Sequence, residues 1–166
     1  MSSYVKLIIF VVVLLIISAG VVLIQSSMDN INESMPAISD GIVQGDRDYN
    51  ESVRLLNNRD FVLSREMADS AEENYNGSLE KLESIRDKYS NDLNDVHKDY
   101  IDATINELKL KLKAVTELKE SIYYLGSYYN YTGSNYGIQA NGYMQDSLKY
   151  QNERNEIFRE NPELFT

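Results

Sequence analysis

The chain has 166 residues, contains no cysteine and carries 26 acidic against 16 basic side chains, for a formal net charge of −10. The lack of cysteine excludes disulfides and thiolate chemistry. The acidic balance argues against nucleic-acid binding, which requires clustered basic side chains, and against electrostatic adhesion to anionic lipid. The length fits one domain plus a membrane anchor.

The most apolar segment covers residues 7–24, with the sequence LIIFVVVLLIISAGVVLI and no charged side chain. As a helix this segment spans roughly 27 Å, close to the thickness of a bilayer's hydrocarbon core. A cleaved signal peptide is the alternative, because Ser18-Ala19-Gly20 resembles a cleavage site. The apolar run continues through Val21–Ile24, where a cleavage region turns polar. We therefore expect an uncleaved transmembrane helix.

The charges on either side of this segment predict its orientation. Lys6 precedes it, whereas only acidic charges follow it before the first basic residue, Arg47. The positive-inside rule then places residues 1–6 in the cytoplasm and the rest of the chain outside the cell membrane.

Asn-x-Ser/Thr motifs are compatible with an exterior, glycosylated surface. Motifs this short also arise by chance, so they carry little weight alone. The candidate glycosylation sites are Asn32, Asn50, Asn76 and Asn130.

Apolar residues recur in steps of three and four through most of the remaining chain, which is the pattern of amphipathic helices. A juxtamembrane stalk over residues 25–33 leads into a bundle domain over residues 34–160, and a tail covers residues 161–166. We expect helices at about 34–57, 60–89, 92–130 and 140–160. The short connections favour antiparallel neighbours. The predicted fold class is all-α, with one N-terminal transmembrane helix followed by an antiparallel bundle of about four amphipathic helices.

Two local patterns predict departures from regular helix. Pro36 favours a kink near Met35-Pro36, with a new helix starting near Ser34. Residues 131–142 contain three glycines among several Asn and Ser residues, which predicts a loop.

The third helix has the most regular apolar stripe. Leu108 and Leu112 are predicted to lie in its core. Lys111 is predicted to be exposed and to form a favourable i,i+4 pair with Glu107.

No catalytic, cofactor or metal-ligand constellation is present in the sequence. His97 is the single histidine, and Asp95 and Asp99 flank it. A metal site needs converging ligands, and neither a His-x-x-x-His nor a Glu-x-x-His pair occurs. A solvated acidic helix start, favoured by the helix dipole, explains this run better. We expect no cofactor, no metal and no enzymatic activity.

Tyrosine is concentrated in one segment, because eight of the 13 tyrosines lie between Tyr123 and Tyr150. Tyrosine offers rigid, amphipathic area for contacts with partner proteins or sugars. Packing at the end of the bundle and a membrane-interface belt are the alternatives. An up-and-down bundle places this segment far from the bilayer, which favours the partner surface over the belt. The candidate partner residues are Tyr124, Tyr128, Tyr131 and Tyr136.

Together these patterns predict a membrane-anchored, extracytoplasmic and non-enzymatic helical domain that serves as an interaction or structural module of the cell envelope. Its expected partners are the membrane, through one span, and another protein or a second copy of the chain, with no nucleic acid. The alternative is a sensor-like bundle that binds a small ligand and acts through a membrane partner. That alternative needs a pocket between helices, with candidate lining residues Gly133, Gly137, Asn141 and Gly142.

Overall fold

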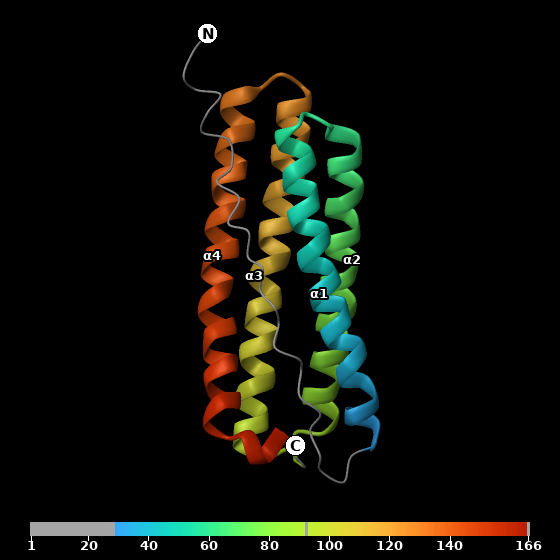
Figure 1. Ribbon diagram of the computed structural model, residues 1–166, viewed down its shortest axis with the longest axis vertical. Coiled ribbons are helices and arrows are strands. Elements are labelled where there is room, and N and C mark those ends of the chain that lie inside the picture. Colours follow the sequence, from blue (N-terminus) through green and yellow to red (C-terminus); the bar gives the residue numbers. More distant parts are fainter. Residues whose placement is uncertain (1–28, 92, 166) are drawn as a thin grey trace.

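The computed structural model describes residues 29–91 and 93–165, which form an up-and-down bundle of α-helices (Figure 1). Sequential helices run antiparallel and are joined by short connections (Figure 1). The elements are α1 at Asp29–Asn57, α2 at Phe61–Lys88, α3 at Asp95–Gly126, α4 at Asn130–Glu160 and a 3-10 helix, η2, at Pro162–Phe165. The prediction of an all-α, four-helix bundle is confirmed.

The predicted transmembrane helix over residues 7–24 lies outside the described residues, as do residues 1–6 and the first part of the stalk. In the part of the chain that the structure describes, no helix is both long and apolar enough to cross a bilayer. The second part of the stalk belongs to α1, which begins at Asp29 and contains Pro36. The prediction of a new helix near Ser34 is therefore wrong.

The predicted loop over residues 131–142 is also wrong, because α4 begins at Asn130 and the chain reverses within residues 127–129. The glycines of this segment allow α4 to approach α3 closely. A Cβ atom added to Gly133 would lie 2.5 Å from Cγ of Leu125. The Ser121 hydroxyl donates a hydrogen bond to the carbonyl of Gly133 at 2.8 Å. Helix packing, not chain reversal, explains why glycine occurs here.

The bundle consists of two tightly packed hairpins, α1–α2 and α3–α4. Contacts between α2 and α3 join the two hairpins. Small residues bring α1 and α2 together. Ser52 donates to the carbonyl of Ser64 at 2.7 Å, and Ser64 donates to the carbonyl of Ser52 at 2.8 Å. A Cβ atom on Gly45 would lie 2.5 Å from the Tyr75 ring. The two helix backbones therefore lie closer together than large side chains would permit.

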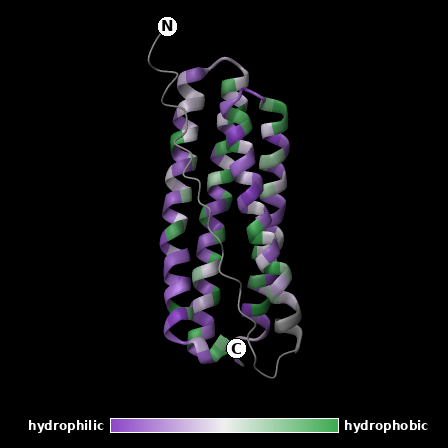
Figure 2. Cartoon of the chain, viewed as in Figure 1, coloured by the Kyte–Doolittle hydropathy of each residue, from purple (hydrophilic) through white to green (hydrophobic). Residues whose placement is uncertain are grey.

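The apolar core runs along the bundle, and each helix contributes a stripe of buried residues. Leu108 is fully buried, as predicted, whereas Leu112 is only partly buried and packs against the edge of the core. Much of the α4 ribbon carries the colour of hydrophilic residues (Figure 2). Its buried stripe nevertheless keeps heptad spacing, through Gly133, Gly137, Ala140, Met144, Ser147, Gln151 and Arg154.

The two ends of the bundle differ in character. The α1–α2 and α3–α4 turns lie together at one end, here called the turn end (residues 57–61 and 125–131) (Figure 1). The start of α1, the α2–α3 connection and η2 lie at the opposite end, here called the entry end (Figure 1). The Asn57-Asn58 turn and the tyrosines of the α3–α4 turn therefore share one end of the bundle.

His97 helps to close the entry end. Its ring packs edge-on against Phe165 with centroids 5.3 Å apart, and Tyr100 and Phe158 contact the same phenyl ring at 5.1 and 5.5 Å. A His97 ring nitrogen lies 2.9 Å from the carbonyl oxygen of Leu164. His97 is thus a buried packing residue that holds the C-terminal turn, whereas Asp95 and Asp99 are exposed in the first turns of α3, as expected of a solvated acidic helix start.

Candidate functional site

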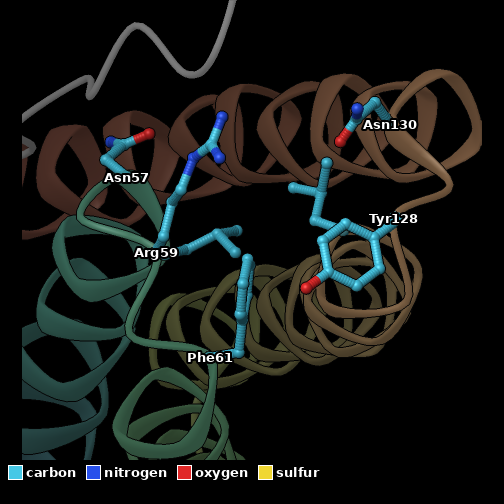
Figure 3. A pocket seen from close by; sticks show the side chains of 7 residues that line it. Asn57, Arg59, Phe61, Tyr128 and Asn130 are labelled. Carbon is cyan, nitrogen blue, oxygen red and sulfur yellow. The ribbon is translucent and has the colours of Figure 1, made fainter.

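A pocket of about 280 Å³ opens at the turn end between the two hairpins (Figure 3). The first hairpin lines it with Leu56, Asn57, Arg59 and Phe61, and the second with Leu125, Tyr128 and Asn130. In Figure 3 the Tyr128 ring lies across from the ring of Phe61, with its hydroxyl directed toward Phe61. The pocket therefore combines aromatic and aliphatic walls with polar groups from both turns.

Both turns have the same unusual backbone geometry. Arg59 has φ of 62° and Tyr128 has φ of 66°, and no other non-glycine residue of the described part has a positive φ. The next amide in each turn donates to a carbonyl five residues earlier, Asp60 to Leu55 at 3.0 Å and Tyr129 to Tyr124 at 2.8 Å. This is the Schellman arrangement that ends a helix, in which the left-handed residue is usually glycine.

Here the left-handed positions carry large side chains, which costs about 1–3 kcal/mol at each position. Arg59 and Tyr128 both line the pocket. Two non-glycine residues with a left-handed backbone thus line the same pocket. Local strain of this kind is often found at functional sites.

The polar groups of the pocket have no partner within the described residues. The guanidinium of Arg59, the side-chain amides of Asn57 and Asn130 and the Tyr128 hydroxyl make no hydrogen bond or ion pair there. Arg54, in the last turn of α1, pairs instead with Glu51 at 2.5 Å. The Arg59 charge is therefore free to meet a ligand.

The structure exposes two of the four tyrosines predicted to form a partner surface and leaves the other two half-buried. Tyr128 and Tyr131 are 89% and 82% exposed. Tyr124 and Tyr136 are half-buried and stack on each other between α3 and α4, with ring centroids 5.3 Å apart and planes 7° apart.

Other exposed apolar side chains at or near the turn end were not predicted. They are Tyr123, Tyr129, Val62 and Leu63. The tyrosines belong to the same enriched segment, so composition could have found them. The two aliphatic residues open α2 directly after the turn, and their exposure depends on a helix phase that the sequence does not define clearly.

None of the residues proposed to line a ligand pocket, Gly133, Gly137, Asn141 and Gly142, lines the pocket at the turn end. Gly133 and Gly137 face α3 instead, since Cβ atoms added there would meet Leu125 and Ser121. Among the candidate glycosylation sites, Asn76 and Asn130 are exposed and Asn50 is half-buried, while the Asn32 side chain lies outside the described residues.

A second polar feature, the buried charged layer, lies inside the bundle and draws on all four helices: Asp46, Tyr75, Glu107, Lys111 and Arg154. The Lys111 ammonium lies 2.6 Å from Asp46 Oδ1 and 2.9 Å from Glu107 Oε1. Arg154 Nη1 lies 3.1 Å from Glu107 Oε2. The Tyr75 hydroxyl donates to Asp46 Oδ1 at 2.6 Å. Two carboxylates thus balance two cations across both hairpins.

The prediction that Lys111 is exposed is wrong, because its side chain is only 1% exposed. Burial by itself lowers the pKa of Lys111, but Glu107 and Asp46 outweigh it and hold the pKa above its ordinary value. Burial, reinforced by the Asp46 carboxylate, raises the pKa of Tyr75 well above its ordinary value. Lys111 is therefore charged and Tyr75 neutral at pH 7.

Several polar atoms of this region lack good hydrogen bonds within the described residues. The Glu107 oxygens lie at ion-pair distance from their cations, yet neither accepts a hydrogen bond of good angular geometry. The Tyr49 hydroxyl is buried without a partner. Such a layer adds little net stability, because the desolvation of buried ions offsets their attraction.

Comparison with protein-family models gives no match for this chain. Searches of curated proteins and of solved structures give no match either.

Proposed function

We propose that the chain is a single-pass, membrane-anchored and extracytoplasmic module that recognises a partner protein through the turn end and performs no catalysis. The observation that carries the proposal is the convergence at that end of a pocket, two residues with a strained left-handed backbone and exposed tyrosines. Tyrosine and arginine are the residue types that most often dominate binding energy at protein interfaces.

The direction of the chain supports this arrangement. α1 begins at Asp29 in the entry end, and in the sequence only residues 25–28 separate it from the proposed anchor over residues 7–24, so the entry end is the one that would face the membrane. α1 has 29 residues, which corresponds to about 43 Å of helix. The turn end would then stand well clear of the lipid, where a partner in the envelope can reach it.

Site-specific photo-crosslinking in native membranes tests the proposal. A benzophenone amino acid replaces Tyr131 at the turn end or, as a matched control, Asn91 at the entry end, since both positions are exposed. We expect a discrete crosslinked product from position 131 and none from position 91. Protease added to intact cells should also remove the bundle. Equal products from both positions, or full protection of the bundle in sealed cells, would refute the proposal.

The pocket between the hairpins favours one alternative, a sensor that binds a small ligand and acts through a membrane partner. In that case ligand binding should change the packing of one hairpin against the other, because both line the pocket. Spin labels at Arg47 on α1 and Glu153 on α4, both exposed, would report a ligand-dependent change in distance. If the distance between the two spin labels did not change when a ligand bound, the sensor alternative would be rejected and partner recognition would remain.

A further inference from the structure

The chemistry of the pocket narrows the kind of group that it can hold. Arg59 is a cation without an ion pair among the described residues, in a chain with a net charge of −10. Such an acidic chain repels anions at long range, so a free arginine in a pocket acts locally, by direct contact. Guanidinium groups bind carboxylates through paired hydrogen bonds.

The rest of the lining complements a carboxylate attached to an apolar group. The side-chain amides of Asn57 and Asn130 can donate to carboxylate oxygens. Phe61 and Tyr128 present ring surfaces, and Leu56 and Leu125 add aliphatic surface. The pocket therefore places hydrogen-bond donors for an anion next to an apolar surface that can contact a side chain.

The size of the pocket favours a single amino-acid residue. Its volume of about 280 Å³ lies just below the range of typical small-molecule sites, about 300–1,000 Å³. The residues that line the pocket come from or adjoin two turns, and both turns lie at one end of the bundle (Figure 1).

We propose that this pocket captures the C-terminal residue of a partner protein, with the terminal carboxylate on Arg59 and the asparagine amides and an apolar side chain against Phe61 and Tyr128. The proposal rests on the proposed function and names the chemistry of its partner. It also explains why the strained position of the first turn holds arginine instead of glycine. A chain terminus offers a carboxylate whatever its sequence, and the apolar wall adds selectivity.

The experiment uses the full-length protein in lipid nanodiscs and the tripeptide acetyl-Gly-Gly-Phe, with a free carboxylate or as its C-terminal amide. Isothermal titration calorimetry should detect binding of the acid. The amide should bind at least about tenfold more weakly than the acid. NMR of ring-labelled tyrosines should show a shift of the Tyr128 signal on addition of the acid.

Two arginine variants separate the site from general electrostatics. Arg59→Asn removes the charge and keeps a residue type that accepts a left-handed backbone, so it should weaken binding of the acid by about tenfold. Arg54→Asn removes the same charge from the last turn of α1 and should leave binding unchanged, because Arg54 does not line the pocket. Thermal melting of Arg59→Asn should match or exceed that of the native chain, which shows that the loss is not unfolding.

Three outcomes would overturn the proposal. They are equal binding of acid and amide, equal losses in both arginine variants, and a Tyr128 shift with N-acetylglucosamine but none with the tripeptide, which would assign the aromatic walls to a sugar. Crosslinking from position 131 without tripeptide binding would keep the proposed function and reject this ligand. Tripeptide binding together with protection of the bundle in sealed cells would support this ligand and reject the proposed extracytoplasmic function.

Discussion

Lys111→Met provides a direct test of the buried charged layer. Methionine keeps a flexible, unbranched side chain and removes the ammonium group. Asp46 and Glu107 then lose the cation at 2.6 and 2.9 Å from their oxygens, and Glu107 is 0% exposed. Breaking a buried ion pair from one side costs about 3–5 kcal/mol.

That cost is a large share of a typical domain stability of about 5–15 kcal/mol. It corresponds to a fall in melting temperature of about 6–20 °C for a chain of this size. Urea denaturation followed by circular dichroism measures the free energy, and thermal melting provides an independent check.

Lys109→Met is the matched control, since it makes the same substitution two positions earlier in α3. The Lys109–Glu83 pair is short, at 2.8 Å, but its side chains are 50% and 41% exposed. Exposed pairs contribute about 0–1 kcal/mol. Equal losses from the two methionine variants would show that Lys111 is not buried and would refute the layer.

Three further predictions concern the core and its titration. Tyr49→Phe should raise the free energy of unfolding by about 1–3 kcal/mol, because it removes a buried hydroxyl that has no partner among the described residues; a loss of stability in urea denaturation would mean that the hydroxyl is bonded. Gly45→Ala should destabilise the bundle by about 1–3 kcal/mol, because the added methyl meets the Tyr75 ring. Gly77→Ala has open space around its Cβ atom and should stabilise by about 1 kcal/mol, so the two melting shifts should have opposite signs. Stability should fall as the pH rises above about 10, since the unfolded chain loses protons there that Tyr75 and Lys111, whose pKa values are raised, keep in the folded state; an unfolding free energy that is equal at about pH 9 and pH 11 would contradict this.

Periodicity was sufficient to predict the helices that have large apolar stripes. The steps of three and four that include Ile101, Leu108 and Leu118 predicted a helix at about 92–130, and α3 lies within this range at Asp95–Gly126. This works because burial of one helix face needs only local spacing.

Composition failed where a residue's role depends on a distant helix. Gly133 and Gly137 were predicted to lie in a loop, but the structure places them in α4, where this helix packs against α3. Lys111 was predicted to be exposed. Its burial depends on an ion pair with Asp46, which lies 65 residues away in the sequence and cannot be inferred from local spacing. Long-range packing overrides local preference in both cases.

The pocket depended on information that a sequence pattern does not hold. Arg59 and Tyr128 carry no motif, and their left-handed backbone becomes evident only in three dimensions. Enrichment in tyrosine pointed to the end of the bundle where the pocket lies, but it could not separate the exposed Tyr128 from the stacked Tyr124.

The orientation of the bundle relative to the membrane is the most direct test of the account. A spin label is attached at Asn58 in the turn end or at Asn91 in the entry end, both exposed, in the full-length protein reconstituted into liposomes. Relaxation by a lipid-bound nickel chelate then compares their distances from the bilayer. We predict stronger relaxation at Asn91 than at Asn58. Stronger relaxation at Asn58 would place the turn end against the lipid and contradict its role as a partner surface.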